Sequence, residues 1–542
     1  MNSIPQVPHP VNEPVKGFAP GSPERAELKA ALEVMAAEQI EIPLIIGGKE
    51  VRTGNTHTSV MPHDHGHVLA TYHMAGEAEV RQAVKAALEA QREWAAWPWE
   101  DRLAVFLRAA DLLATSHRPT LNAATMLGQS KTSHQAEIDA ACEMIDFFRF
   151  NAAYAQKLYT EQPLSPAGQW NRLDHRPLEG FVYAVTPFNF TSIAGNLPTA
   201  PAMLGNVVVW KPAATAIYSA WYIMRLLMEA GLPPGVINFV PGDPVATSGV
   251  LLNDPHLAGL HFTGSTTVFQ SIWKTVGDNI ASYKGYPRLV GETGGKDFIL
   301  GHASADPAAL ATAIVRGGFE YQGQKCSAAS RIYVPESIWP EVKELTLDQI
   351  GRIRMGDPTD FRNFMGAVID RKAFDKITGY IKHAQAASDV EIIAGGGFDD
   401  GKGYFIEPTL VQVQNSAYQL MCEEVFGPVV SLYVYPDNDW AGTLEVIDRT
   451  TPYALTGAVF ANDRAALVEA DRALRFAAGN YYINDKPTGA VVGQQPFGGA
   501  RASGTNDKAG SILNMMRWIS PRAIKETFAP PRSFEYPFMS EE

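Results

Sequence analysis

Four apolar runs decide the fold of this chain: FVYAVTPFNF (residues 181–190), VVVWKP (207–212), INFV (237–240) and LAGLHFTGS (257–265). Each run contains a short apolar segment typical of a buried strand, and a helical pattern over residues 217–230 separates the second run from the third. Strands that alternate with helices in this way predict right-handed βαβ crossovers and a parallel sheet. We therefore expect an α/β domain in this part of the chain.

A second alternating region follows Gly295. Short apolar segments predict strands at residues 298–300, 331–334, 429–434, 457–460 and 481–484, with helices between them. The fold class predicted for the whole chain is therefore α/β, divided into two domains.

The first 160 residues carry mainly helical patterns. A helix is expected over residues 23–39, and Gly47-Gly48 indicates a hairpin within residues 42–51. After two amphipathic helices, a longer helix is expected over residues 133–158. Its four acidic residues are expected to form a solvated face: Glu137, Asp139, Glu143 and Asp146.

Composition excludes several classes of protein. The chain has 542 residues, of which 46% are hydrophobic and 19% charged, so it is expected to fold into globular domains. With 45 Lys and Arg against 58 Asp and Glu, its net charge of -13 repels phosphate backbones and anionic lipid surfaces. We expect neither a nucleic acid nor a membrane as a partner.

The three cysteines, Cys142, Cys326 and Cys422, are too few for a disulfide framework and favour a reducing compartment. The opening residues MNSIPQVPHPVNEP lack the basic and apolar regions of a targeting signal. The expected location is the cytoplasm.

Cys326 is a candidate nucleophile. It follows a predicted helix in the turn FEYQGQKCSA (319–328), where the adjacent Lys325 could stabilise an exposed thiolate. The alternative is a buried packing cysteine, which is the interpretation we give to Cys142 and Cys422.

Two further polar residues follow predicted strands. Glu292, in GETGGK (291–296), could act as a general base or could cap the next element. Asn189, in TPFNF (186–190), could donate from its amide to a developing oxyanion or could serve only in a turn.

Thr263, Gly264 and Ser265 end one predicted strand and begin a helix, whose amino end could bind a pyrophosphate. The glycine fingerprint of ordinary dinucleotide-binding domains does not follow a strand here, so this signal is weak alone. Lys211 follows another strand and could reach a ribose or phosphate, or could be a solvated lysine.

The sequence predicts no metal site. His63, His65 and His67 alternate in a polar segment without a metal-binding helix or cysteine pair, and we interpret them as surface residues.

Taken together, the motifs PFNF, KP, FTGS, GETGGK, GQKCS and EEVFGP resemble the NAD(P)-dependent aldehyde dehydrogenase superfamily, and the similarity runs nearly end to end. The segments IDFFRFN, LEGFVYAVTPFNF, FEYQGQKCSA, YINDKPTG and QQPFGGARASGTND resemble its Δ1-pyrroline-5-carboxylate dehydrogenase branch, which oxidises glutamate 5-semialdehyde. The resemblance implies a Rossmann-like NAD-binding domain, an α/β catalytic domain and a β-flap for oligomerisation.

The resemblance also implies catalytic roles. Cys326 would attack the aldehyde carbon, and the Asn189 amide together with the Cys326 backbone N–H would hold the oxyanion. Glu292 would activate the water that hydrolyses the resulting thioester.

The implied cofactor is NAD. Lys211 would bind the adenosine ribose, Thr263, Gly264 and Ser265 the pyrophosphate, and Glu424 with Phe426 the nicotinamide ribose and ring. Two positions depart from the common pattern: Ala214, where many relatives have a glutamate that disfavours NADP, and Phe269, where many have glycine.

The implied substrate site uses Ser327, Gly489 and Ala490 to bind the carboxylate and amine end of the semialdehyde. Phe190 and Phe497 would contact its aliphatic part, and Glu143 would face the pocket toward the amine.

The resemblance implies the domain boundaries. The NAD-binding domain would comprise residues 1–164 and 183–295, and the catalytic domain residues 296–508. Residues 165–182 and 509–542 would form the flap and the C-terminal tail. It further implies a homodimer or higher oligomer, a possible functional pairing with proline dehydrogenase, and a bacterial cytoplasm, or a mitochondrial matrix if the protein is a processed eukaryotic one.

Three alternatives remain open at this point. Another aldehyde dehydrogenase, for example one for succinate semialdehyde, would share Cys326, Glu292 and Asn189 but need a different anchor. A cysteine hydrolase or acyltransferase would need a histidine partner for Cys326. A non-catalytic binding protein could retain the fold alone.

Overall fold

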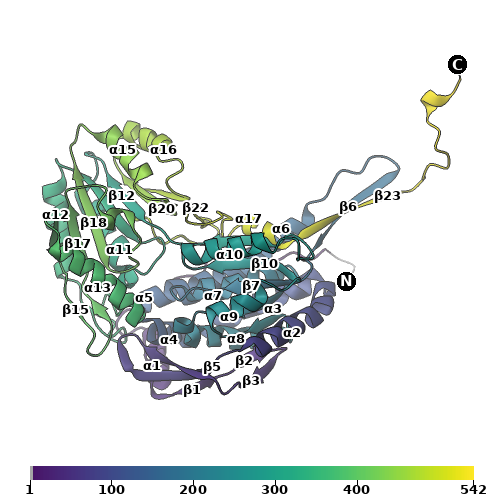
Figure 1. The fold of residues 1–542 in the computed structure, drawn as a ribbon, viewed down its shortest axis with the longest axis horizontal. Coiled ribbons are helices and arrows are strands. Elements are labelled where there is room, and N and C mark those ends of the chain that lie inside the picture. The colour runs from purple at the N-terminus through teal and green to yellow at the C-terminus, as the bar shows by residue number, and fades with distance from the viewer. Residues whose placement is uncertain (1–3, 542) are drawn as a thin grey trace.

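The computed structural model describes residues 4–541, and its body is built around two seven-stranded sheets (Figure 1). The strands of the first sheet are, in spatial order, β11 (Arg288–Glu292), β10 (Leu257–Thr263), β7 (Phe181–Val185), β8 (Val207–Lys211), β9 (Ile237–Phe239), β2 (Leu44–Ile46) and β3 (Lys49–Val51). The first five of these strands run parallel, whereas β2 is antiparallel to both of its neighbours. The predicted parallel sheet and hairpin are therefore both present.

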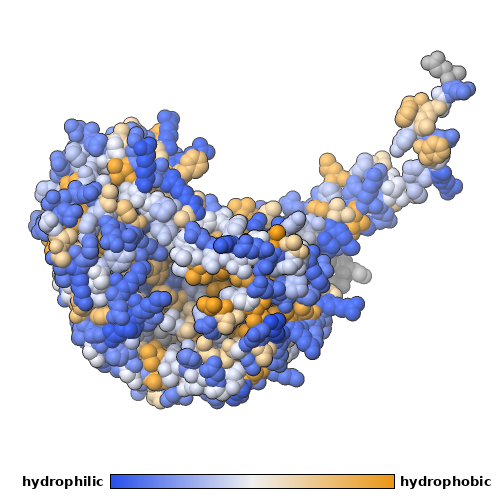
Figure 2. All heavy atoms as spheres, viewed as in Figure 1, coloured by the Kyte–Doolittle hydropathy of each residue, from blue (hydrophilic) through white to orange (hydrophobic). Residues whose placement is uncertain are grey.

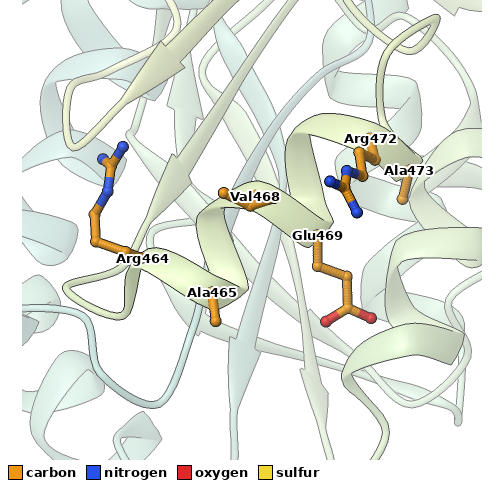
Figure 3. A pocket seen from close by; sticks show the side chains of 6 residues that line it. All are labelled: Arg464, Ala465, Val468, Glu469, Arg472 and Ala473. Carbon is orange, nitrogen blue, oxygen red and sulfur yellow. The ribbon is translucent and has the colours of Figure 1, made fainter.

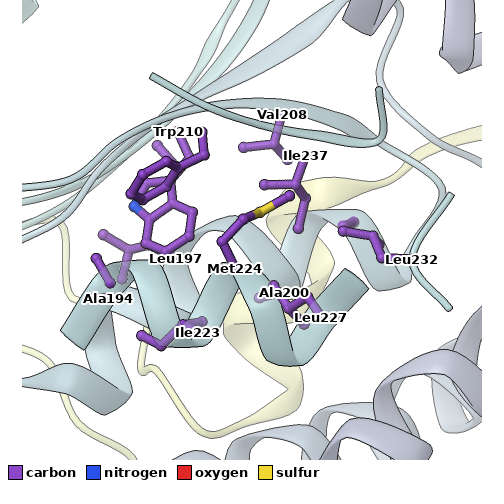
Figure 4. Packing of buried hydrophobic residues seen from close by; sticks show 14 of the residues in the cluster. Ala194, Leu197, Ala200, Val208, Trp210, Ile223, Met224, Leu227, Leu232 and Ile237 are labelled. Atoms are coloured by element: carbon purple, nitrogen blue, oxygen red, sulfur yellow. The ribbon is translucent and has the colours of Figure 1, made fainter. Parts of the chain in front are cut away.

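Helices cover the first sheet because its strands are apolar on both faces. Side chains of α7 and α8 pack against Trp210, Val208 and Ile237 from the strands (Figure 4). All three of these strand residues are almost fully buried. The helices of this part are α2 (Glu77–Ala96), α3 (Trp99–Ala114), α4 (Arg118–Gln129), α6 (Met144–Thr160), α7 (Thr191–Met203), α8 (Ile217–Glu229), α9 (Pro244–Leu251) and α10 (Thr266–Asp278).

The second sheet has two cores, one on each face. Its strands are, in spatial order, β14 (Val390–Ala394), β17 (Thr409–Val413), β18 (Val429–Tyr435), β13 (Ala329–Pro335), β12 (Asp297–Gly301), β20 (Thr456–Phe460) and β21 (Asn480–Ile483). Only β14 is antiparallel to its neighbour. The helices around it are α11 (Pro307–Phe319), α12 (Trp339–Gly351), α13 (Arg371–Ala386), α15 (Trp440–Arg449) and α16 (Arg464–Ala473).

Two smaller units complete the fold. Helix α1 (Pro23–Ala37) precedes a three-stranded sheet of β1 (Ile40–Ile42), β5 (Asp64–His73) and β4 (Thr56–Met61). Strands β6 (Gln169–Arg176) and β23 (Ser520–Thr527) pair antiparallel over their full length and project from the body as a ribbon (Figure 1). Between residues 4 and 541, no helix combines the length and the apolar character needed to cross a membrane.

The order of the strands brings opposite ends of the two sheets together. Asn189, Lys211, Ser265 and Glu292 follow or end strands of the first sheet at their carboxyl ends. Cys326 precedes β13 of the second sheet at its amino end. Ligands bind in open α/β sheets at such carboxyl ends, so the space between the two sheets is the expected place for a site.

The prediction that the four acids after residue 133 form a solvated helix face is wrong. The segment is interrupted by a π-helical turn (Glu137–Glu143) between α5 (Ser133–Ala136) and α6, and three of its four acids are buried. Burial of a carboxylate requires a partner. Each acid has one: Glu137 binds Arg118, Asp139 binds Lys131, Glu143 binds Ser192 and Asp146 binds Asn12.

The interpretation of His63 as a surface residue is also wrong. Its side chain is buried, Nδ1 lies 3.2 Å from Ser130 Oγ, and Nε2 lies 3.7 Å from Asp357 Oδ1. Burial lowers the pKa of His63 to about 4, so the ring is neutral at pH 7. His65 and His67 are partly exposed, and each has a backbone carbonyl partner.

Candidate active site

A cavity of about 430 Å³ lies between the two sheets and contains Cys326 in its lining. Its lining residues come from five distant parts of the chain: 12–15, 134–146, 190–193, 325–327 and 486–497. The first part belongs to the N-terminal arm, which we define as residues 4–22 before α1, and the second includes the π-helical turn. The predicted substrate residues all line it: Phe190, Ser327, Gly489, Ala490, Phe497 and Glu143.

Cys326 lies in a tight turn between α11 and β13. The preceding Tyr321 and Gln322 have left-handed backbone conformations, with φ values of 50° and 54°, and both side chains are buried. Such strain persists only where surrounding contacts fix the backbone. The Gln322 amide supplies them, because its Nε2 donates to the carbonyl oxygens of Ser130 and Ala367 at 3.0 and 2.8 Å.

Gly295 allows the two sheets to approach at this turn. A Cβ on Gly295 would lie 2.3 Å from the carbonyl oxygen of Cys326, far inside van der Waals contact. The motif glycine is therefore required for the acid-bearing strand to approach the nucleophile turn.

The expectation that Lys325 stabilises the thiolate is not what the structure shows. Lys325 Nζ donates instead to Glu320 Oε2 at 3.1 Å. Burial, followed by the carboxyl groups of Asp297 and Glu292, raises the pKa of the Cys326 thiol. The thiol is therefore protonated at neutral pH in this state and needs a proton acceptor to become a nucleophile.

Glu292 ends β11, where it makes an isolated bridge to Gly504. Its Oε2 accepts from the backbone N–H of Gly499 at 3.2 Å. Burial raises the pKa of Glu292 well above its usual range, while the Gly499 hydrogen bond and the charge of Lys508 oppose that rise. A carboxylate with a raised pKa is suited to general-base chemistry near neutral pH.

Asn189 is buried between β7 and α7. Its Nδ2 donates to the carbonyl oxygen of Gln324 at 3.1 Å, two residues before Cys326. This contact fixes the amide beside the nucleophile turn, as an oxyanion donor would need to be.

None of the predicted cofactor residues lines the Cys326 cavity. Four of them lie at the carboxyl ends of β8 and β10: Lys211, Thr263, Gly264 and Ser265. Ser265 caps α10, its Oγ accepting from the N–H of Val268 at 3.4 Å. Lys211 is only 7% exposed, yet its ammonium has one hydrogen-bond partner, the Pro212 carbonyl at 3.4 Å. Burial lowers the pKa of Lys211 to about 8. Both groups therefore have unused capacity to bind an anion or a hydroxyl group.

The face presented by α9 and α10 carries apolar side chains (Figure 2). Val245 of α9 is 82% exposed and Val268 of α10 is 49% exposed. Phe269, which departs from the common pattern, is buried beneath this face and stacks on Phe262 with ring centroids 5.3 Å apart. A flat ring bound here would have apolar contacts beside Lys211 and Ser265.

Glu424 and Phe426 lie between the two sheets, just before β18. Glu424 Oε1 accepts from the N–H of Gly295 at 2.9 Å, and burial raises the pKa of its carboxyl group. The Phe426 ring meets Phe188 edge to face at 5.8 Å. Glu424 thus contacts the motif that carries Glu292, and Phe426 contacts the motif that carries Asn189.

The predicted carboxylate anchor includes Ser327. Ser327 Oγ lies 2.8 Å from Thr488 Oγ1, so the residue after the nucleophile is joined directly to the loop that carries Gly489 and Ala490. Gly489 has a φ of 102°, a conformation that favours glycine. Beyond this loop, the backbone of Phe497 forms an isolated antiparallel β-bridge with that of Ala509.

Sequence reasoning missed the buried lysine under Phe190. Lys131 Nζ lies 2.7 Å from Asp139 Oδ2 and 4.3 Å from the centre of the Phe190 ring. The same Asp139 carboxylate accepts from the N–H groups of Thr191 and Ser192 at the start of α7. The spacing of the acids, which resembles that of an amphipathic helix, does not indicate a buried pair of Lys131 and Asp139. The π-helical turn changes which residues face inward.

Glu143 lies at the end of that turn. Its Oε2 accepts from Ser192 Oγ at 2.6 Å, and burial with the nearby Asp139 charge raises its pKa to about 8. Glu143 lines the cavity. With this pKa its carboxyl group is largely protonated at pH 7.

A second hollow, on the outer surface of α16, is unrelated to this site. Its six lining residues belong to that one helix (Figure 3). It contains two arginines and one glutamate on an open surface, without a nucleophile or a buried polar group. The Cys326 cavity, in contrast, contains the predicted nucleophile and substrate residues, although Asn189 and Glu292 are not among its lining residues.

A family model described as the aldehyde dehydrogenase family matches residues 50–523. The chain belongs to the aldehyde dehydrogenase family.

Its relatives define a narrower group. A protein of Dictyostelium discoideum named "Delta-1-pyrroline-5-carboxylate dehydrogenase, mitochondrial" is 52% identical over 98% of this chain and 96% of its own length. A crystal structure of the Delta-pyrroline-5-carboxylate dehydrogenase from Mycobacterium tuberculosis bound with NAD is 54% identical, with a TM-score of 0.97 over 100% of both chains. Proline utilization A from Bdellovibrio bacteriovorus is 29% identical, with a TM-score of 0.91, over 98% of this chain and 55% of its own.

Proposed function

We propose that this protein oxidises L-glutamate 5-semialdehyde, which is in equilibrium with Δ1-pyrroline-5-carboxylate, to L-glutamate with reduction of NAD, the second step of proline catabolism. The observation that carries this proposal is the cavity that joins Cys326 to the loop of Gly489 and Ala490. Relatives at about half identity over the whole chain bear the corresponding name, which supports the same assignment.

The residues present fit NAD. Lys211 offers a buried ammonium with free donors, and the capped amino end of α10 offers backbone N–H groups for a pyrophosphate. Glu424 and Phe426 lie where they can contact a ribose and a ring beside Gly295. Bound NAD supplies the acceptor for the hydride that leaves the substrate.

The protein's own residues account for the remaining steps. The Cys326 thiol gives its proton to a base and its sulfur bonds to the aldehyde carbon, while Asn189 Nδ2 and the Cys326 N–H hold the oxyanion. Loss of the hydride leaves a thioester on Cys326. Glu292 then takes a proton from water, whose oxygen attacks the thioester and releases the acid and the free thiol.

The cavity favours a semialdehyde that carries its own carboxylate. Backbone N–H groups at Gly489 and Ala490, with the Ser327 hydroxyl, are suited to bind an anion. Phe190 and Phe497 offer aromatic surface for the short aliphatic chain, and Glu143 faces the amine end.

The test is to mix the purified protein with NAD and Δ1-pyrroline-5-carboxylate and to follow NADH and glutamate. We expect turnover that Cys326→Ala abolishes, with NAD binding retained. Preference for succinate semialdehyde would assign the same chemistry to another substrate. Ester hydrolysis without any NAD-dependent oxidation would instead favour a hydrolase.

The remaining proposals concern assembly. The domain boundaries expected from the sequence are supported by the division between β11 and β12, where the first sheet ends and the second begins. Within the described residues, β23 pairs with no strand other than β6, so its outer edge is open, whereas Gln162 and Ser165 bind the outer edge of β6. The open edge of β23 supports pairing with a second copy in a homodimer or larger oligomer. Light scattering on the intact chain and on a chain ending at residue 519, which keeps the buried Trp518 and removes β23, measures this. A functional pairing with proline dehydrogenase is supported only by the likeness to proline utilization A.

The proposed compartment is a reducing one, the bacterial cytoplasm, or the mitochondrial matrix if the source is eukaryotic. The three cysteines are free, which supports a reducing environment. Fractionation of the source cells tests it.

A further inference from the structure

We propose that Asn12 is a positioning residue that holds the anchor loop, defined as residues 488–494, at the correct distance from Cys326. Asn12 thereby sets the preference for aldehydes that carry a carboxylate. This inference rests on the proposed function, because it concerns the loop of Gly489 and Ala490 that would bind the substrate carboxylate.

Asn12 uses its whole amide group to join three parts of the chain. Its Nδ2 donates to the carbonyl oxygen of Val492 and to Asp146 Oδ2, both at 2.8 Å. Its Oδ1 accepts from Gln494 Nε2 at 3.0 Å. Asn12 also lines the cavity itself. One side chain therefore links the N-terminal arm, α6 and the anchor loop.

The N-terminal arm can act as a fixed support because Glu13, next to Asn12, makes several strong polar contacts. The Glu13 backbone N–H donates to Asp146 Oδ1 at 2.7 Å, and the Glu13 carboxylate pairs with Arg118 and with Arg149. Arg118 is almost fully buried, so its ion pair is poorly screened by solvent.

Contacts on either side of Asn12 extend this attachment. The Lys16 N–H donates to Glu137 Oε1, and the Val7 N–H donates to Gln156 Oε1, each at 2.8 Å. The arm is thus bonded to the π-helical turn and to α6 at intervals along its length.

The anchor loop depends on such external contacts. Among the described residues, none of residues 488–494 belongs to a helix or a strand. Thr488 contacts Ser327 at one end, and Val492 with Gln494 contacts Asn12 at the other. Gly489 and Ala490 lie between these two attachments, so both are needed to fix the distance from their backbone to Cys326.

A bound aldehyde must satisfy two constraints at once: its carboxylate must reach the loop and its carbonyl carbon must reach the thiol. Small displacements at such a site strongly reduce reaction rates. A short aldehyde without a carboxylate has only the second constraint. Loss of the Asn12 contacts is therefore expected to affect the first kind of substrate and spare the second.

The experiment compares wild type, Asn12→Ala and the exposed-site control Asn462→Ala with Δ1-pyrroline-5-carboxylate and with propanal. We expect Asn12→Ala to lower kcat/KM for Δ1-pyrroline-5-carboxylate about tenfold, mainly through KM, as fits the loss of two or three hydrogen bonds. The inhibition constant of L-glutamate should rise by a similar factor. For propanal, kcat/KM should stay within about twofold of wild type on the same reasoning.

A second variant, Gln494→Ala, removes one of the same contacts from the loop side and should give a smaller change of the same kind. Equal losses for both substrates would assign Asn12 a general structural role and overturn the inference, as would an unchanged KM for Δ1-pyrroline-5-carboxylate. Failure of the wild-type protein to oxidise this substrate would instead count against the proposed function.

Discussion

The ammonium group of Lys131 donates to the carboxylate of Asp139 across 2.7 Å, and both side chains are buried. Asp139 also lines the Cys326 cavity. Asp139 also accepts from the first two N–H groups of α7, the helix that follows Asn189 and Phe190. The pair therefore joins the π-helical turn to the segment that carries the proposed oxyanion donor, Asn189.

We expect Lys131→Met to destabilise the protein by about 3–5 kcal/mol, because it leaves the Asp139 carboxylate buried without its cation. Urea denaturation followed by circular dichroism measures this. Arg81→Met is the control, since the Arg81 pair with Glu77 is exposed and contributes about 0.5 kcal/mol or less. Equal effects of the two substitutions would show that burial does not strengthen the Lys131 pair.

Asn189→Ala is expected to lower kcat about 10²–10³-fold, because it removes one donor from a buried oxyanion site. Steady-state NADH formation with Δ1-pyrroline-5-carboxylate is the measurement, and the exposed Asn415→Ala serves as the control. A loss seen only in KM would argue that Asn189 binds the ground state and not the developing oxyanion.

The hydrolytic step is expected to lose activity as the pH falls, because Glu292 acts as a base only when ionised. Burial raises the pKa of Glu292, and the charge of Lys508 partly offsets this rise. Lys508 Nζ also donates to the carbonyl oxygen of Gly498 at 2.9 Å, next to the residue whose N–H binds Glu292. Lys508→Met removes the nearby cation, so the acid limb of the pH profile should move to higher pH.

Hydrolysis of p-nitrophenyl acetate from pH 5 to 9 reports this limb without NAD. The titratable neighbours are few: Asp507, which raises the pKa of Glu292 and pairs with Arg517 at 3.3 Å, and Cys326 across the site. The exposed Lys284→Met is the control. An acid limb that stays in place in Lys508→Met would assign Lys508 a purely structural role.

Lys211→Met is expected to weaken NAD binding roughly tenfold or more, as fits the loss of a hydrogen bond from a charged donor. Titration with NADH, followed by its fluorescence, gives the dissociation constant. Lys274→Met lies on the exposed side of α10 and should bind NADH as the wild type does. Equal affinity in both variants would place the cofactor elsewhere.

The strands, and the turn that carries Cys326, could be predicted from the sequence because their signals are local. The apolar run at residues 181–185 forms β7, and Cys326 lies in a motif that can be recognised within ten residues. The carboxyl ends of parallel strands then determine where Lys211 and Glu292 lie.

Contacts between distant segments could not be predicted. The sequence around Glu137 and Asp139 suggests solvated acids because their partners, Arg118 and Lys131, lie outside the helical segment that carries them. His63 is buried by Ser130 and by a loop some 300 residues later in the chain, to which its spacing gives no clue. Lys325 next to Cys326 was a misleading signal, since Glu320 neutralises it.

The contact between Asn12 and Val492 has a consequence for biosynthesis, because the two residues are 480 positions apart. A ribosome that adds about 5–20 residues per second needs roughly 25–100 s to make the second partner after the first. The N-terminal arm therefore remains without its contact to the anchor loop while most of the protein is still being translated. Until then a nascent chain has no completed substrate cavity, so an aldehyde cannot be bound and oxidised before synthesis is nearly finished.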